Sequence, residues 1–131
     1  MSPVVLAVSC PTALVLADAA ALAEAWLSSA EKERLARFKL PSDGADFQAA
    51  HLLIRKCAAR LLGVHPGDVS IVQRCATCGG PHGRPEVEGH PEVGASLAHS
   101  RGVVAAAAGT APVGIDVEAL LSADTLTAGE L

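Results

Sequence analysis

The chain has 131 residues, a formal net charge of −4, 50% apolar residues and only 2% aromatic residues. This length predicts one domain, and the apolar content excludes an intrinsically disordered chain, which needs low hydrophobicity and high charge. The acidic balance and the near absence of aromatic rings argue against a nucleic-acid-binding protein, which typically offers a basic surface or rings for base stacking.

The N-terminal residues do not predict a targeting or membrane-spanning segment. Residues 1–17 carry no charged side chain, but Pro3 and Pro11 interrupt them and no lysine or arginine precedes them. A secretory signal needs a basic start, and a membrane span needs about 20 apolar residues in a row. We therefore expect a cytoplasmic protein without a membrane partner, whose four cysteines are thiols rather than a disulfide framework.

Strand and helix patterns alternate at the start of the chain. Residues 4–8 and 13–16 are short apolar runs, which predict two strands. Residues 19–27 are rich in alanine, which predicts a helical segment. Ser28 and Glu31 have the spacing of a capping box, in which each side chain bonds to the backbone N–H of the other residue. This box predicts the start of a second helix.

The longest predicted helix covers residues 46–62, after the second helix has ended near Pro41. Its apolar residues recur three and four positions apart and form one stripe. The members of this stripe are Phe47, Ala50, Ile54, Cys57, Ala58 and Leu61. Gly63 predicts the end of the helix, and a short strand is expected at residues 69–72.

The second half of the chain predicts a long loop followed by a hairpin. Residues 74–94 are rich in Gly, Pro and His and predict a loop. Residues 103–108 and 113–117 predict two antiparallel strands joined by a turn at 109–112. We therefore expect a single α+β domain over residues 1–131, with a small, mainly antiparallel sheet packed on one long helix.

Two carboxylates, Asp116 and Glu118, stand two positions apart in the last predicted strand. Because side chains alternate along a strand, both carboxylates should face one side, and such a pair can share one Mg²⁺ with phosphate oxygens and water. The alternative is that the two acids are simply solvated on an exposed strand face, and the spacing alone favours this alternative over a metal site.

Two further segments offer groups that bind phosphate. His99, Ser100 and Arg101 lie before the strand expected at 103–108, and Arg84 follows a glycine that lets the backbone approach a ligand. The alternative for each segment is a turn on the surface.

A Cys-x-x-Cys pair and a histidine lie within the predicted loop. Cys75, Cys78 and His82 could hold zinc with a fourth ligand such as His90. No second Cys-x-x-Cys completes a zinc ribbon, and a redox pair would need a βαβ unit that the pattern does not show.

Three motifs follow one another in order: Gly-Arg-Pro at 83–85, Ser-Leu-Ala-His-Ser at 96–100 and Gly-Ile-Asp-Val-Glu at 114–118. This series resembles the motifs of the surfactin-type (Sfp-like) 4'-phosphopantetheinyl transferases. Upstream, residues 27–38 resemble the leading helix of that family, and residues 51–55 resemble its long helix. The resemblance covers most of the chain.

The resemblance implies one half of a two-lobed α+β fold and an enzyme that moves the phosphopantetheine arm of coenzyme A to a serine of an acyl or peptidyl carrier protein. It implies that Asp116 and Glu118 hold Mg²⁺ on the coenzyme A pyrophosphate, and that His99 belongs to the catalytic residues. The residues that it assigns to coenzyme A are Arg84, Pro85, His99, Ser100 and Arg55.

The carrier and the second half of the site are further expectations. Residues 31–60 carry seven Lys or Arg against four Asp or Glu, which would suit the acidic recognition helix of a carrier. The chain resembles the first half of the family only, and a later W-x-x-K-E-A motif is not found in it. Glu130 resembles the start of the second half. A complementing second half would supply the missing Lys and Glu, whereas a homodimer would restore the pseudo-symmetry without them. Asp46 stands where the family commonly has an arginine.

Two other functions stay open. The chain could be a truncated remnant that binds coenzyme A without catalysis. It could also be a small interaction domain stapled by zinc at the Cys-x-x-Cys pair.

Overall fold

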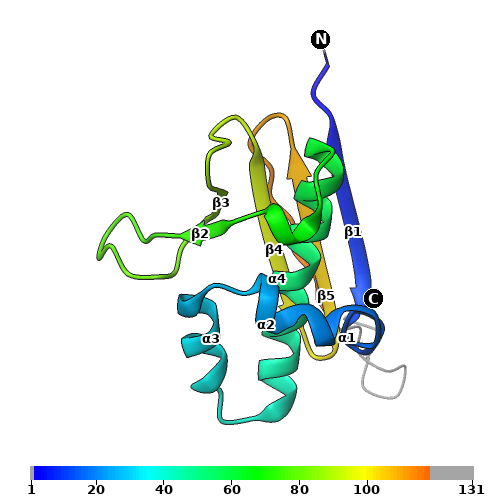
Figure 1. Ribbon diagram of the computed structural model, residues 1–131, viewed down its shortest axis with the longest axis vertical. Coiled ribbons are helices and arrows are strands. Elements are labelled where there is room, and N and C mark those ends of the chain that lie inside the picture. The colour runs from blue at the N-terminus through cyan, green and yellow to red at the C-terminus, as the bar shows by residue number, and fades with distance from the viewer. Residues whose placement is uncertain (1, 119–131) are drawn as a thin grey trace, which may run out of the picture.

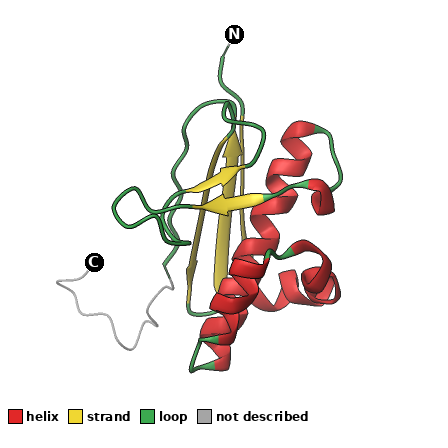
Figure 2. Ribbon diagram, turned by 60° about the vertical axis from the view of Figure 1, so that its left-hand side comes forward, coloured by secondary structure: helices red, strands yellow, loops and turns green. Residues whose placement is uncertain are grey.

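The strands and helices of this protein form two layers. The computed structural model describes residues 2–118, and Glu130 lies outside the described residues. The strands are β1 (Val5–Pro11), β2 (Ile71–Gln73), β3 (Pro85–Val87), β4 (Gly94–Ser100) and β5 (Val103–Gly109). The helices are α1 (Thr12–Ala19), α2 (Ala23–Trp26), α3 (Ser29–Ala36) and α4 (Pro41–Leu62), with 3₁₀ turns at Ala20–Leu22 and Pro66–Asp68. The helices lie on one side of the sheet, and loops occupy the other side (Figures 1 and 2).

The sheet is antiparallel at each pairing and has the order β1-β5-β4-β3-β2. Strand β5 pairs along its whole length with β4 on one edge and with β1 on the other. The expected fold class, an α+β arrangement of a mainly antiparallel sheet packed on one long helix, is therefore confirmed. Within residues 2–118, no helix is both long and apolar enough to cross a membrane.

Helix α4 supplies the largest part of the core. It starts at Pro41 rather than near residue 46, because proline fits the first turn of a helix, where its missing N–H is not needed. It ends before Gly63, which adopts the left-handed conformation with φ 71°. The predicted apolar stripe is largely confirmed, and its buried members are Phe47, Ala50, Ile54, Cys57 and Ala58.

Residues 13–16, which the apolar run predicts as a strand, belong instead to helix α1. Val15, Ala19 and Ala23 are buried, whereas Leu14 is exposed. Val15 and Ala19 stand four residues apart and so lie on one face of α1 against the core, which Ala23 joins from α2. The strand prediction was wrong because buried residues recur every three or four positions over a longer stretch, and this helical period outweighs the β propensity of the short apolar run at residues 13–16.

The predicted hairpin of residues 103–108 with 113–117 is also wrong. Strand β5 forms its hairpin with β4, and residues 112–118 form no strand. Because β1 and β4 occupy both edges of β5, the chain that leaves β5 has no edge there to pair with. It folds back against the sheet instead, and a Cβ added at Gly94 would lie 2.2 Å from the carbonyl oxygen of Ala111.

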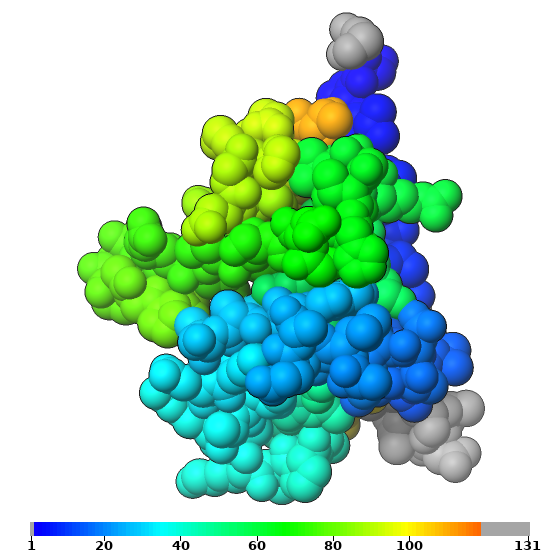
Figure 3. Space-filling view, in the orientation of Figure 1, coloured from blue at the N-terminus to red at the C-terminus, as the bar shows by residue number. Residues whose placement is uncertain are grey.

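The predicted loop at residues 74–94 contains a strand of its own. Strand β3 interrupts it and pairs with β2, so that Ile71 lies opposite Val87. Ile71 and Val87 are buried, which explains why this part of the glycine-rich segment is extended. The remaining connection, residues 74–84, projects from the body of the molecule (Figures 1 and 3).

A buried cluster of three ionisable side chains fixes helix α3 to helix α4. The predicted capping box is confirmed: the amide of Glu31 donates to Ser28 Oγ at 3.2 Å, and the amide of Ser28 donates to Glu31 Oε1 at 2.8 Å. The Glu31 carboxylate also accepts two hydrogen bonds from Arg55, at 2.5 and 2.9 Å, and contacts His51 Nδ1. All three side chains of the cluster are nearly inaccessible to solvent, so each depends on the others for its charge balance.

We predict that acid weakens this cluster. Burial alone would raise the pKa of Glu31, but hydrogen bonds from His51 and Arg55 lower it from 4.5 to about 2. The carboxylate therefore contributes up to about 3 kcal/mol to the free energy of unfolding, in full above about pH 5, and loses this contribution as the pH falls toward 2. Burial also lowers the pKa of His51. Below about pH 6.5 the unfolded chain therefore binds a proton at His51 more readily than the folded chain does, which also lowers the free energy of unfolding as the pH falls. Urea unfolding at about pH 7, 5 and 3 measures this decline.

The matched variants for this prediction are Glu31→Gln and Glu24→Gln. The first leaves the buried Arg55 without a countercharge and should lower the free energy of unfolding by about 3–5 kcal/mol. The second breaks an exposed pair with Lys32, at 2.9 Å, and should change it by less than about 1 kcal/mol. Equal losses in the two variants would contradict the structural role of the cluster.

Asp46 ties three segments together. Its buried carboxylate accepts a hydrogen bond from Thr12 Oγ1 at 2.6 Å, and its two oxygens lie 3.1 and 3.2 Å from the amide nitrogen of Gly102. Gly102 lies in the turn between β4 and β5 and has a φ of 88°. The acid at this position therefore links α1, α4 and the β4–β5 turn, and it does not face a ligand.

Replacing Asp46 by alanine should lower the free energy of unfolding by about 3 kcal/mol, because it leaves the buried Thr12 hydroxyl and the part-buried Gly102 amide without their charged acceptor. Asp43→Ala, on an exposed position in the first turn of the same helix, should cost less than about 1 kcal/mol. Denaturant unfolding compares the two variants, and hydrogen exchange at the Gly102 amide should accelerate in Asp46→Ala alone. An unchanged Gly102 amide would speak against this link.

Candidate functional site

Two arginines border one hollow beside strand β3. The hollow has a volume of about 430 Å³, and Arg74, Arg84 and Pro85 line it. Its other ionisable lining residues are Glu86, Glu88, His90 and Glu92. The arginines can bind a phosphate or carboxylate group, while the glutamates favour a ligand that also has a positively charged group or a bound cation. Arg74 was not among the predicted site residues. The one feature of the sequence that could have drawn attention to it is its position directly before the Cys-x-x-Cys pair.

The predicted carboxylate pair lies on an extended segment rather than on a strand. Asp116 and Glu118 are exposed, whereas Ile115, before the pair, and Val117, between its two members, are half-buried. This alternation keeps both carboxylates on the solvent side. The amide of Ile115 donates a hydrogen bond to Ser96 Oγ at 3.1 Å, which ties the segment to strand β4.

The start of this segment reaches the hollow that the arginines border. Pro112 lines the hollow together with Arg84. Asp116 stands four positions after Pro112, so the carboxylate-bearing residues begin within about 14 Å of the hollow along the chain. An extended ligand can therefore contact both places.

Strand β4 divides the remaining predicted residues between the two faces of the sheet. Ala95 is buried in the core under α4, and Leu97 packs against it. Because side chains alternate along a strand, His99 starts on that same face, while Ser96 and Ser100 share the opposite face. The exposed imidazole of His99 is thus separated by the sheet from the segment that Ser96 binds. The structure does not bring His99 together with the carboxylate pair.

Arg55 serves the interior of the protein. Its side chain is 1% exposed, and its guanidinium donates to Glu31 and to the carbonyl oxygen of His51. This position does not support the predicted contact of Arg55 with coenzyme A, because the group already has a buried countercharge and no open surface.

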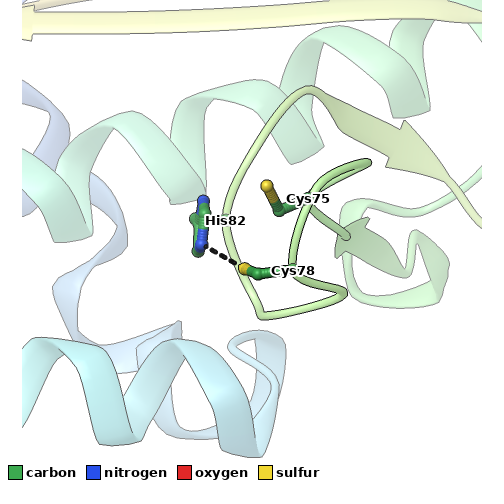
Figure 4. Close-up of side chains that lie close together, drawn as sticks. All are labelled: Cys75, Cys78 and His82. Atoms are coloured by element: carbon green, nitrogen blue, oxygen red, sulfur yellow. Dashed lines mark hydrogen bonds between the residues drawn. The ribbon is translucent and has the colours of Figure 1, made fainter.

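The predicted zinc residues do come together. The ligand atoms of Cys75, Cys78 and His82 all lie within 4.8 Å of one another, and Cys78 Sγ lies 3.1 Å from His82 Nε2 (Figure 4). His90, the predicted fourth ligand, does not join them. Its Nδ1 lies 3.3 Å from a carboxylate oxygen of Glu92, at the hollow of 430 Å³. The chain thus gathers three of the four groups that a closed zinc site would need.

Comparison with known proteins adds no family to this description. No protein-family model matches this chain, and no curated protein matches it. The resemblance to the transferases therefore stays a prediction from the motifs, and the chemistry of the residues above has to support any function.

Proposed function

We propose that this chain takes part in the Mg²⁺-dependent transfer of the 4'-phosphopantetheine arm of coenzyme A to a serine of an acyl or peptidyl carrier protein. The observation that carries the proposal is the placement of Asp116 and Glu118 on the solvent side of an extended segment. Their order after the Gly-Arg-Pro and Ser-Leu-Ala-His-Ser motifs supports the same family.

The carboxylate pair fits a magnesium ion. Mg²⁺ commonly binds through one or two protein carboxylates and fills its other positions with water and phosphate oxygens. Asp116 and Glu118 are exposed and leave space for such ligands. When bound, the ion would offset the negative charge that develops on the leaving phosphate as the P–O bond within the coenzyme A pyrophosphate breaks.

Arg84 and Arg74 are the groups that would orient the diphosphate. Their guanidinium groups at the hollow can form bidentate hydrogen bonds to phosphate, and Pro112 connects the hollow with the carboxylate segment. The serine hydroxyl of the carrier would attack the phosphorus of the arm and release its proton to solvent, and the P–O bond to the leaving 3',5'-ADP would break. His99 and Arg55 have no part in this proposal, because alternation along β4 puts His99 on the far face of the sheet and Arg55 is buried.

The carrier would approach through the basic end of helix α3. Arg34, Arg37 and Lys39 are exposed there, and an acidic helix of a carrier would complement them. Attraction between exposed charges of this kind mainly raises the rate of association and weakens with salt.

Transfer is tested by incubating the chain with coenzyme A, Mg²⁺ and an apo-carrier and measuring the mass of the carrier. We expect the mass of the arm to appear only with both coenzyme A and Mg²⁺. Asp116→Asn should lower the rate by about 100-fold or more, because the metal loses a charged ligand. Asp68→Asn, at an exposed acid in a 3₁₀ turn, is the matched control and should leave the rate unchanged.

Binding of coenzyme A by calorimetry, with and without Mg²⁺, separates the outcomes. A carrier that gains no mass, with binding that still depends on Mg²⁺ and Asp116, would replace transfer by the function of a non-catalytic coenzyme A-binding protein. Binding that ignores both Mg²⁺ and Asp116→Asn would overturn the proposed metal site as well.

A further inference from the structure

The connection between β2 and β3 folds into a tight turn around two sulfur atoms. The amide of Gly79 donates to the carbonyl oxygen of Cys75 at 2.8 Å, and the amide of Cys75 donates to the carbonyl oxygen of Gly80 at 2.9 Å. Gly79 has a φ of 72°, which glycine adopts without strain. This backbone turn brings the two cysteine side chains close to His82, and the Cys78 sulfur points at the His82 ring (Figure 4).

Backbone amides of the turn also point at the sulfur atoms. The amide of Thr77 lies 3.4 Å from Cys75 Sγ, and the amide of Gly80 lies 3.3 Å from Cys78 Sγ. Donors directed at sulfur favour the thiolate, which is the form that binds a metal.

The geometry points to a zinc site in which Cys75 and Cys78 supply two thiolates, His82 supplies Nε2, and a ligand from solvent fills the fourth position. Thiolate and imidazole together are typical of zinc, with Zn–S near 2.3 Å and Zn–N near 2.0 Å. Ligand atoms of a tetrahedral ion with these bond lengths lie roughly 3.5–3.8 Å apart. The three ligand atoms within 4.8 Å of one another need only a small closure to reach that spacing.

The fourth position stays open because the described residues offer no further ligand there. Cys75 is half-buried, while Cys78 and His82 are exposed, so the ion would face solvent on one side. His90 contacts Glu92 instead. Three protein ligands with an exchangeable fourth position make a weaker site than four protein ligands, and water or a small thiol can complete it.

The ion would stiffen the wall of two hollows. Strands β2 and β3 have only three residues each, so their pairing alone holds the 74–84 connection weakly. Pro81 of this connection lines a second hollow, of about 290 Å³, and Arg84 lines the hollow of about 430 Å³. Zinc would close the loop at 75–82 and hold both residues in place. This inference is independent of the proposed transfer reaction.

Cobalt titration of the reduced, metal-free chain tests the site directly. We expect one Co²⁺ per chain, with the thiolate charge-transfer and visible bands of a tetrahedral ion, and zinc should displace it. Cys78→Ser and His82→Ala should each weaken binding by about tenfold or more, because each removes a ligand. Cys10→Ser and His90→Ala are the matched controls and should bind as the parent does. Circular dichroism checks that each variant is folded.

Other results would overturn the inference. Absent tetrahedral bands, or equal weakening in Cys10→Ser, would exclude a site at these residues. A chain that forms a Cys75–Cys78 disulfide, two hydrogens lighter by intact mass, and takes up no zinc after reduction would establish a thiol pair instead. A loss of binding in His90→Ala would show a closed site with four protein ligands rather than an open one.

Discussion

Strand β5 has no free edge, and the rest of the structure follows from this constraint. β1 and β4 occupy both of its edges, while α4 covers the face that carries Val104, Ala106 and Ala108. The chain that leaves β5 can only cross the other face, where the Ser96 hydroxyl holds it. Its apolar residues turn toward the sheet, so the carboxylates of Asp116 and Glu118 face solvent. The exposed acidic pair is thus a consequence of the strand order.

Charged groups inside the helical layer serve the fold rather than a ligand. Glu31 neutralises Arg55 across α3 and α4, and Asp46 binds the turn between β4 and β5. Both acids are buried, so each is costly without its partners. Their positions show that part of the charge in residues 31–60 belongs to the interior, so only its exposed basic residues are free to meet a partner. Most residues of the 74–84 connection are exposed instead, and the candidate zinc ligands gather there.

Local signals in the sequence predicted local structure well. The Ser28–Glu31 capping box, the apolar stripe of α4 and its end at Gly63 depend on neighbouring residues and are confirmed. The Cys75-x-x-Cys78 pair with His82 was predictable for the same reason. The pairing partner of the strand after residue 103 depends on the order of strands in the sheet. The roles of His99 and Arg55 depend on which face of a strand or helix is covered by other elements. Neither property can be read from local patterns in a single sequence. The buried pairing of Arg55 could have been suspected from its position four residues after His51, on one face of α4.

Metal binding at the carboxylate pair is the central claim of the proposed function, and nuclear magnetic resonance with Mn²⁺ in place of Mg²⁺ tests it most directly. Mn²⁺ prefers carboxylate, phosphate and water oxygens as Mg²⁺ does, and it broadens the signals of nearby amides. With coenzyme A present, we expect broadening centred on residues 114–118 and its loss in Asp116→Asn. Broadening centred instead on the acids at 86–92, and unchanged in that variant, would contradict the account.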